Sequence, residues 1–213
     1  MSATASEAFI LRTYPLREAD LIVSYFTRDQ GKLRGVARRA RKPGNRFGST
    51  LERLSYVKVF YFHRENRDLD SIDSAELLRS HFTLAADYEL AVALDYLAEV
   101  SEQLLPPHEV NERFFRLLLA VTGWLLETGR AGLWPAVNYF TLWAVRLSGI
   151  LAPVEISEAD REMAEEMLRA PIAKLSPREW SRLTGSGLRR RLVGLMEAHT
   201  ERRFLTAQYL ETL

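Results

Sequence analysis

A run of cations between residues 32 and 46 is the densest chemical feature of this 213-residue sequence. The segment reads KLRGVARRARKPGNR and holds seven basic residues and no acidic one. Its basic residues are Lys32, Arg34, Arg38, Arg39, Arg41, Lys42 and Arg46. Because no carboxylate within the run neutralises them, they form a local positive field that attracts phosphates. The density of the run, which ends in a Pro-Gly-Asn turn, favours a nucleic-acid partner over a solvated basic loop without any partner.

A second group of cations, Arg189, Arg190 and Arg191, follows a Gly-Ser-Gly segment near the expected start of a C-terminal helix. Cations at a helix N-terminus oppose the helix dipole, at a cost of roughly 0.3–1 kcal/mol each. A bound phosphate would relieve that repulsion, and the glycine-rich segment offers backbone N–H groups to it. This group is therefore a candidate second basic site. The competing interpretation, which we favour, is a flexible connector followed by a solvated basic helix.

Chemistry that breaks or makes covalent bonds has no recognisable motif here. The absence of cysteine excludes disulfides, a thiol nucleophile and cysteine-ligated metal sites. The four histidines are scattered and form no local metal-ligand pair. Phosphate-binding and dinucleotide-binding glycine motifs are missing, as is the serine-hydrolase elbow. We therefore expect neither an enzyme nor a metal site nor a cofactor, and an enzyme whose metal ligands converge only in the fold is the least favoured class.

Charge is distributed unevenly along the chain. Residues 1–80 carry 15 basic against 10 acidic side chains, residues 81–174 carry 7 against 14, and residues 175–213 carry 7 against 4. The net charges are therefore +5, −7 and +3, which together give the overall +1. A negative middle repels phosphate and is better suited to protein partners. The basic ends and the acidic middle indicate separate surfaces for separate partners.

The elements that must position the basic run are short strands. Apolar segments separated by turn signals predict five of them, over 8–14, 21–28, 33–39, 55–63 and 69–77. In the third strand, alternation places Lys32, Arg34, Val36 and Arg38 on one face, with its three cations pointing outward. The aromatic side chains of the fourth strand lie on both of its faces, and we favour core packing over base stacking for them. Five short strands with a basic hairpin predict an OB-fold barrel.

A helical period begins at about residue 80. Apolar residues recur at three- and four-residue steps, and they predict helices over about 80–105, 109–127, 136–147, 157–169 and 187–204. Ser157 is the expected N-cap of the fourth helix. The predicted fold class is therefore α+β, with an OB-fold DNA-binding domain over residues 1–79 followed by an all-α helical domain over residues 80–213.

No targeting or membrane segment is apparent. The longest apolar run that could suggest a span covers 117–126, about half the length that a spanning helix needs. Glu7 falls where a signal peptide would be apolar. We expect a cytoplasmic, nucleoid-associated protein without a membrane partner.

The assembled residues resemble a known family, the bacterial recombination-mediator protein RecO. The resemblance rests on AFILRTYPLREADLIVSYFTRDQGKLRGVARRARKPGNRFGSTL from residue 8 onward. It continues through LDSIDSAELLRSHFTLAADYELAVALDYLAEVSEQLLPPHEVNERFFRLLL, and the C-terminal ERRFL also resembles the family. It covers essentially the whole chain and is strongest over residues 8–120.

The resemblance implies a DNA repair and recombination protein without catalysis of bond breaking. Members bind single- and double-stranded DNA and anneal complementary strands. They bind the C-terminal tail of single-stranded-DNA-binding protein and, with RecR and often RecF, load RecA at gaps. The family's basic strand and loop fall on the cluster from Lys32 to Arg46. For the acidic tail, which needs a cation beside an apolar groove, we consider Arg113, Arg116 and Arg130.

One departure from the family concerns zinc. Many members carry four zinc-binding cysteines after the third helix, in the region that follows Gly149 here, and this chain has none. Packing of residues 157–171 must therefore hold that region. The alternative function is a generic OB-fold nucleic-acid-binding accessory protein, which would bind nucleic acid without annealing strands.

Overall fold

The computed structural model describes residues 4–63 and 68–213 and divides the chain into two compact units. The first unit comprises the chain up to Phe82 together with Leu105–Phe115. The second comprises Thr83–Leu104 and Arg116–Leu213. Each unit has a buried core of its own.

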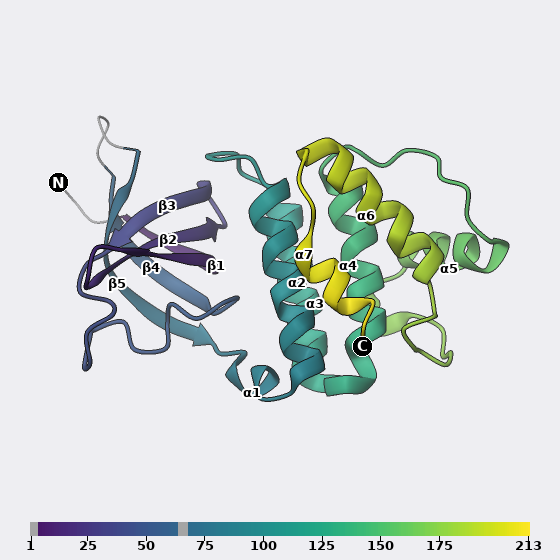
Figure 1. Ribbon diagram of the computed structural model, residues 1–213, viewed down its shortest axis with the longest axis horizontal. Coiled ribbons are helices and arrows are strands. Elements are labelled where there is room, and N and C mark those ends of the chain that lie inside the picture. The colour runs from purple at the N-terminus through teal and green to yellow at the C-terminus, as the bar shows by residue number, and fades with distance from the viewer. Residues whose placement is uncertain (1–3, 64–67) are drawn as a thin grey trace. The chain divides into compact units, whose positions relative to one another are not determined.

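The first unit is built on a closed five-stranded barrel, drawn in purple and blue in Figure 1. Its strands are β1 (Thr4–Leu16), β2 (Asp20–Thr27), β3 (Gly31–Ala37), β4 (Tyr56–Phe62) and β5 (Asp70–Arg79). They close in the order β1-β2-β3-β5-β4, with β3 and β5 parallel and the other neighbours antiparallel. Closure pairs the edges that an open sheet would leave exposed.

Side chains at alternating positions along the strands fill the interior of the barrel. Ile10, Val23, Tyr25 and Leu33 are buried in its core. The register of β1 against β2 shifts between Ile10 and Arg12, so one extra residue changes which side chains point inward. Beyond that bulge, Arg12, Tyr14 and Leu16 face outward. The bulge therefore decides which side of β1 is available to a partner.

One end of the outer barrel face is covered by residues from outside the barrel. Phe9 pairs with Phe26 across β1 and β2, and both point outward, yet both are completely buried. Their rings pack against Phe114 and Phe115 at the start of α3 (Glu112–Thr128), at centroid distances of 5.2 to 6.0 Å. The segment 105–115 thus caps this end of the barrel exterior.

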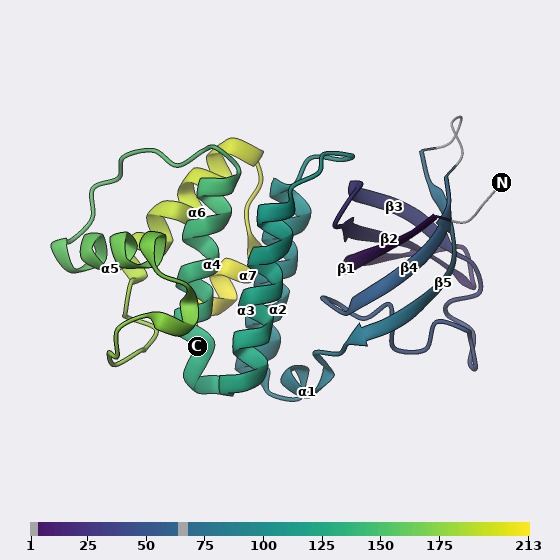
Figure 2. The same ribbon diagram turned by 180° about the vertical axis from the view of Figure 1, so that it is seen from behind.

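The second unit is a helical bundle, seen from behind in Figure 2. Besides the rest of α3 it contains α1 (Phe82–Ala85), α2 (Tyr88–Leu104), α4 (Leu133–Leu147), α5 (Glu158–Arg169), α6 (Ser186–Thr200) and α7 (Leu205–Leu210). Two short 3-10 turns lie at Gly129–Gly132 and Ile172–Lys174. The central helix α4 packs against α2 and α6, and α7 packs against α2.

The region after Gly149 is held by packing and capping. Ser157 caps α5 by accepting a hydrogen bond from the Asp160 N–H at 3.1 Å. The buried side chains Met163 and Met167 fix the inner face of α5. The indole N–H of Trp143 on α4 donates to the Met167 carbonyl at 3.0 Å. This short helix, visible beside its long extended connection in Figure 2, is thereby anchored to the bundle.

The structure confirms the predicted fold class, a five-stranded barrel followed by helices. The predicted C-terminal helix over 187–204 ends early, at Thr200, because Glu201 adopts a left-handed conformation that ends α6, and the separate helix α7 begins only at Leu205. Among the residues that the structure describes, none of the helices combines the length and the apolarity that a membrane crossing requires.

Candidate nucleic-acid interface

The outer face of β1, β2 and β3 carries two rows of side chains beyond the covered end. The first row runs across the three strands as Arg12, Ser24 and Arg34, which are cross-strand partners. The second row is Tyr14, Ile22 and Val36, paired in the same way. The first row presents two exposed arginines, and the second is apolar and partly exposed.

Two arginines lie beside the Tyr14 ring. The guanidinium carbon of Arg12 is 5.1 Å from the ring centroid, and that of Arg34 is 5.9 Å from it. These distances are within the range of cation–π attraction, which is worth about 0.5–1 kcal/mol at an exposed site. Tyr14 thus brings an aromatic ring between cations from two different strands.

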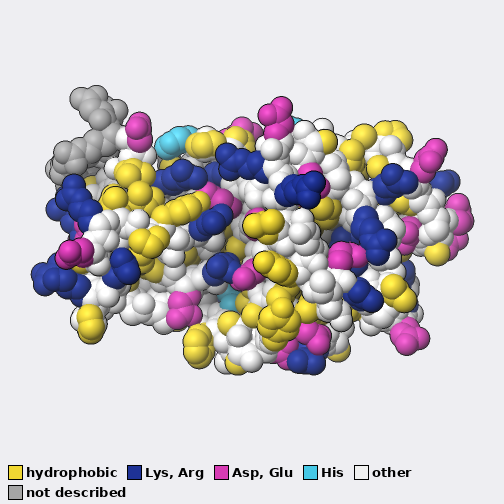
Figure 3. All heavy atoms as spheres, in the orientation of Figure 1, with side chains coloured by type: hydrophobic (Ala, Val, Ile, Leu, Met, Phe, Trp, Pro, Cys, Tyr) yellow, Lys and Arg dark blue, Asp and Glu magenta, His cyan; other side chains and the backbone are white. Residues whose placement is uncertain are grey.

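The basic run continues from β3 into the loop beyond it. Arg38, Arg39, Arg41 and Lys42 are all exposed. Figure 3 shows several Lys and Arg side chains over the barrel, at the left of the view, close to hydrophobic ones. We use "basic surface" for the six exposed cations of β3 and this loop. They are Arg34, Arg38, Arg39, Arg41, Lys42 and Arg46.

Hydrogen bonds from backbone N–H groups hold the loop against the start of β2 and the turn before it. The Arg39 N–H donates to the Asp20 carboxylate at 2.8 Å, and the Arg41 N–H donates to the Ala19 carbonyl at 3.0 Å. Arg39 has a φ of +60°, a left-handed conformation that turns the chain away from the strand. The basic loop therefore starts from a fixed position at the end of β3.

The far end of the basic surface is anchored in the barrel core. Phe47 is 2% exposed, and Asn45 accepts hydrogen bonds from the N–H groups of Phe47 and Gly48 at 2.9 and 3.1 Å. The adjacent Arg46 pairs with Asp73 on β5 at 3.0 Å. Both side chains of that pair are about half exposed, so water screens their attraction and the pair is weak.

Lys32 is not exposed, although the alternation in the sequence predicts that Lys32, Arg34 and Arg38 all point to solvent. It lies beside Phe26 in the covered outer row and is only 7% exposed. Its carbonyl accepts a hydrogen bond from the His108 N–H at 3.0 Å, because the segment 105–115 crosses this end of the barrel. Exposure along β3 therefore begins at Arg34, and Lys32 is not part of the basic surface.

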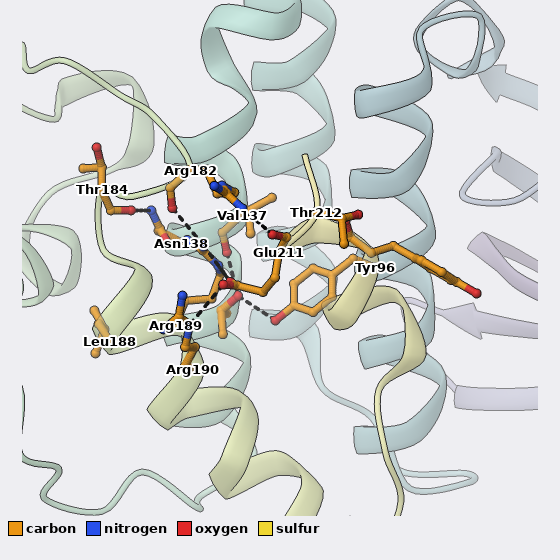
Figure 4. A network of polar contacts seen from close by, with 12 residues as sticks. Tyr96, Val137, Asn138, Arg182, Thr184, Leu188, Arg189, Arg190, Glu211 and Thr212 are labelled. Carbon is orange, nitrogen blue, oxygen red and sulfur yellow. Dashed lines mark hydrogen bonds and ion pairs between the residues drawn. The ribbon is translucent and has the colours of Figure 1, made fainter.

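Arg189 fits neither interpretation of the second cation group, a phosphate site or a solvated basic helix. It is 2% exposed, so it is neither solvated nor open to an anion. Its guanidinium donates to Glu211 at 2.8 and 3.1 Å, to Asn138 at 3.0 Å and to the Arg182 carbonyl at 2.9 Å. Figure 4 shows Arg189 and Glu211 pointing toward each other between α6 and the end of the chain.

Glu211 is the centre of that network. Arg190 also pairs with it at 3.0 Å, while Arg191 is exposed. Burial raises the pKa of Glu211, but the charges and hydrogen bonds of Arg189 and Arg190 outweigh burial, so its pKa lies below the ordinary value. The cation group near the start of α6 thus joins α6 to the C-terminal residues. Sequence spacing alone did not reveal this connection.

The three arginines considered for an acidic tail have different surroundings. Arg113 and Arg116 on α3 are exposed. Arg130 is exposed as well, but it pairs with Asp87 and with Glu89, the latter at 3.3 Å. The hydrogen bond from Arg130, together with its charge, holds the pKa of Asp87 below its usual range. Arg130 therefore already has two carboxylate partners.

Arg12 and Tyr14 are residues of the candidate interface that the sequence did not single out. They lie about 20 residues before the basic run, and their outward direction depends on the bulge in β1. A signal was present in the alternation of Arg12, Tyr14 and Leu16 before the turn. Among the described residues, no group of three or more His, Asp or Glu side chains is arranged to hold a metal ion.

The barrel topology, with its basic and aromatic outer face, defines a protein of the OB-fold class. The sequence profile of the family described as "Recombination protein O N terminal" matches residues 1–81. DNA repair protein RecO of Koribacter versatilis is 38% identical over an alignment that covers 98% of each chain. The chain therefore belongs to the RecO family of DNA repair proteins.

Two further relatives share the same description over shorter segments. DNA repair protein RecO of Bifidobacterium animalis is 37% identical over 58% of this chain and 52% of its own length. DNA repair protein RecO of Frankia casuarinae is 34% identical over 70% of this chain and 61% of its own. Both matches agree with the family assignment.

Proposed function

We propose that the basic surface binds the phosphates of single- and double-stranded DNA. The observation that carries the proposal is the exposure of six cations on one strand and its following loop, fixed to the barrel at both ends. Such cations neutralise the DNA backbone and release its counterions, whatever the base sequence. Lys32 is left out because it is buried.

Strand annealing follows from this mode of binding. Complementary strands repel each other through their phosphates until base pairing begins. A protein that neutralises phosphates and leaves the bases unpaired lowers that repulsion, and pairing then proceeds downhill without a nucleotide fuel. We therefore propose that the protein anneals complementary strands and works at the nucleoid.

The helical part is proposed to recruit proteins. Residues 81–174 have a net charge of −7, which disfavours a DNA surface there. We assign DNA binding to residues 1–79 and partner binding to residues 80–213. The proposed partners are RecR, RecF and the C-terminal tail of single-stranded-DNA-binding protein. The proposed outcome is RecA loading at gaps that are covered by single-stranded-DNA-binding protein.

For the acidic tail we propose Arg113 and Arg116, because Arg130 is already paired with two carboxylates. A peptide with the tail sequence is expected to bind several-fold more weakly to the Arg113→Ala/Arg116→Ala variant than to an Arg130→Ala control. Equal binding by the double variant and the wild type would remove these two residues from the proposal.

A salt titration of DNA affinity tests the DNA-binding proposal. If about five phosphates are engaged on single strands, the logarithm of the association constant falls against the logarithm of salt with a slope of roughly −3.5. Arg34→Ala is expected to flatten the slope by about 0.7 and to weaken all base sequences alike. Arg191→Ala, which removes an exposed cation of α6, is the matched control. An unchanged slope in Arg34→Ala would contradict the assignment.

A further inference from the structure

The apolar row Tyr14, Ile22 and Val36 is an unusual feature of the barrel exterior. Its three side chains come from three adjacent strands, point away from the barrel core and remain partly exposed. The equivalent outward pair Phe9 and Phe26 is completely covered by Phe114 and Phe115. Within the described part of the first unit, Phe114 and Phe115 thus cover the first pair of rings but not the Tyr14 ring.

Cations lie on both sides of this apolar row. Arg12 and Arg34 lie next to Tyr14 in the neighbouring row, and Arg38 follows Val36 by two residues, just beyond the end of β3. An apolar strip with cations on both sides matches the alternation of base and phosphate in a single strand. A purely electrostatic surface for duplex DNA has no need of the apolar strip.

We infer that Tyr14, supported by Ile22 and Val36, stacks on an unpaired base of single-stranded DNA while Arg12 and Arg34 contact the adjoining phosphates. This inference rests on the proposed DNA binding and adds to it a specific recognition of unpaired strands. Any base offers an aromatic face, so the contact tolerates every sequence. In a duplex the faces are already stacked within the helix, so the row contributes nothing to duplex binding.

The inference is tested by removing the Tyr14 ring from the protein and, separately, the base from the DNA. Affinities are measured for wild type and Tyr14→Leu with an oligothymidylate, an abasic strand of equal length and a duplex. Tyr14→Leu is expected to weaken oligothymidylate binding about 5- to 100-fold and to leave abasic and duplex binding unchanged. The salt slope stays as in the wild type, because no charge is lost.

Two control variants separate stacking from folding. Tyr14→Phe keeps the aromatic face and is expected to bind as the wild type does. Tyr209→Leu removes a 56% exposed tyrosine from α7, in the other unit, and is expected to have no effect on any strand. Photo-cross-linking of an iododeoxyuridine oligonucleotide, mapped by mass spectrometry, is expected to label Tyr14.

The outcomes distinguish this inference from the proposal on which it rests. Equal loss of abasic and oligothymidylate binding in Tyr14→Leu would overturn stacking, because the tyrosine would then act only by positioning arginines. Unchanged oligothymidylate binding would overturn it as well, while the salt slope of Arg34→Ala would still support the basic surface. If the wild type bound none of the three strands, the DNA-binding proposal itself would fail.

Discussion

Gly31 lies against the backbone of Glu109 so closely that a Cβ atom at position 31 would come within 2.3 Å of the Glu109 carbonyl oxygen. Gly31 also has a φ of +74°, which L side chains rarely adopt. Two independent constraints thus require glycine at the β2–β3 turn. This contact seats the segment 105–115 over the barrel, which buries Lys32 and leaves Arg34 as the first exposed cation of β3.

Replacing Gly31 with alanine is expected to destabilise the barrel unit by more than about 2 kcal/mol, because a backbone clash adds to the left-handed strain. Gly44→Ala is the matched control, since Gly44 has a φ of +68° and open space around it. Its cost is the conformational part alone, about 1 kcal/mol. Hydrogen exchange of the β2 and β3 amides measures the destabilisation in each variant. Equal losses of protection in the two variants would contradict a clash at position 31.

Replacing Glu211 with glutamine is expected to destabilise the helical unit by about 2 to 3 kcal/mol, because buried Arg189 loses its counter-charge. Tryptophan fluorescence follows this unit alone, since all four tryptophans belong to it. Arg189 also lies over the Trp134 ring at 4.9 Å. Glu158→Gln breaks an exposed pair with Arg161 and is expected to cost less than about 1 kcal/mol. Similar losses for both variants would contradict the central role of Glu211.

The same carboxylate predicts a pH dependence. The pKa of Glu211 in the folded protein lies below its ordinary value of 4.5, so the folded state holds the proton less tightly than the unfolded state does. Its contribution to stability is therefore present above pH 4.5 and is lost as the pH falls through the folded value. We expect the thermal transitions of wild type and Glu211→Gln to converge below pH 4.5. A constant difference across that range would contradict the lowered pKa.

His81 predicts a second pH dependence, in the barrel unit. Its Nδ1–H donates to the Leu54 carbonyl at 2.8 Å, and burial lowers the pKa of the ring from its ordinary 6.5. The unfolded state therefore binds the proton more readily, and stability falls as the pH drops below 6.5, by at most about 1.4 kcal/mol per pH unit. His81→Asn keeps a donor to Leu54 and cannot titrate. Amide protection in β1 and β4, compared at pH 7.5 and 5.5, should decrease more in the wild type than in the variant, and parallel decreases would contradict this assignment.

The strands and most helices could be predicted because their signals are local. Turn residues such as Asp29 and Gly31 separate apolar runs, and Ser157 marks the start of a helix through its own side chain. These features involve residues three or four positions apart. The fold class followed from them without knowledge of any distant contact.

The site was less predictable because its exposure depends on distant contacts. Lys32 shares an alternating face with Arg34, and only the segment that contains His108 buries it. Arg189 was expected near solvent, yet its partner Glu211 lies 22 residues further along the chain. The register shift in β1 turned Arg12 and Tyr14 outward, and no turn or cap signal in the sequence predicts that bulge.

Annealing of complementary oligonucleotides coated with cognate single-stranded-DNA-binding protein tests the central claim most directly. The wild type is compared with the Arg34→Ala/Arg38→Ala variant, which removes two exposed cations of the basic surface. We predict rapid annealing by the wild type and its loss in the double variant, with unchanged unfolding transitions. Equal annealing by both proteins would contradict the assignment of the basic surface. DNA binding without annealing by the wild type would instead indicate a generic OB-fold binding module.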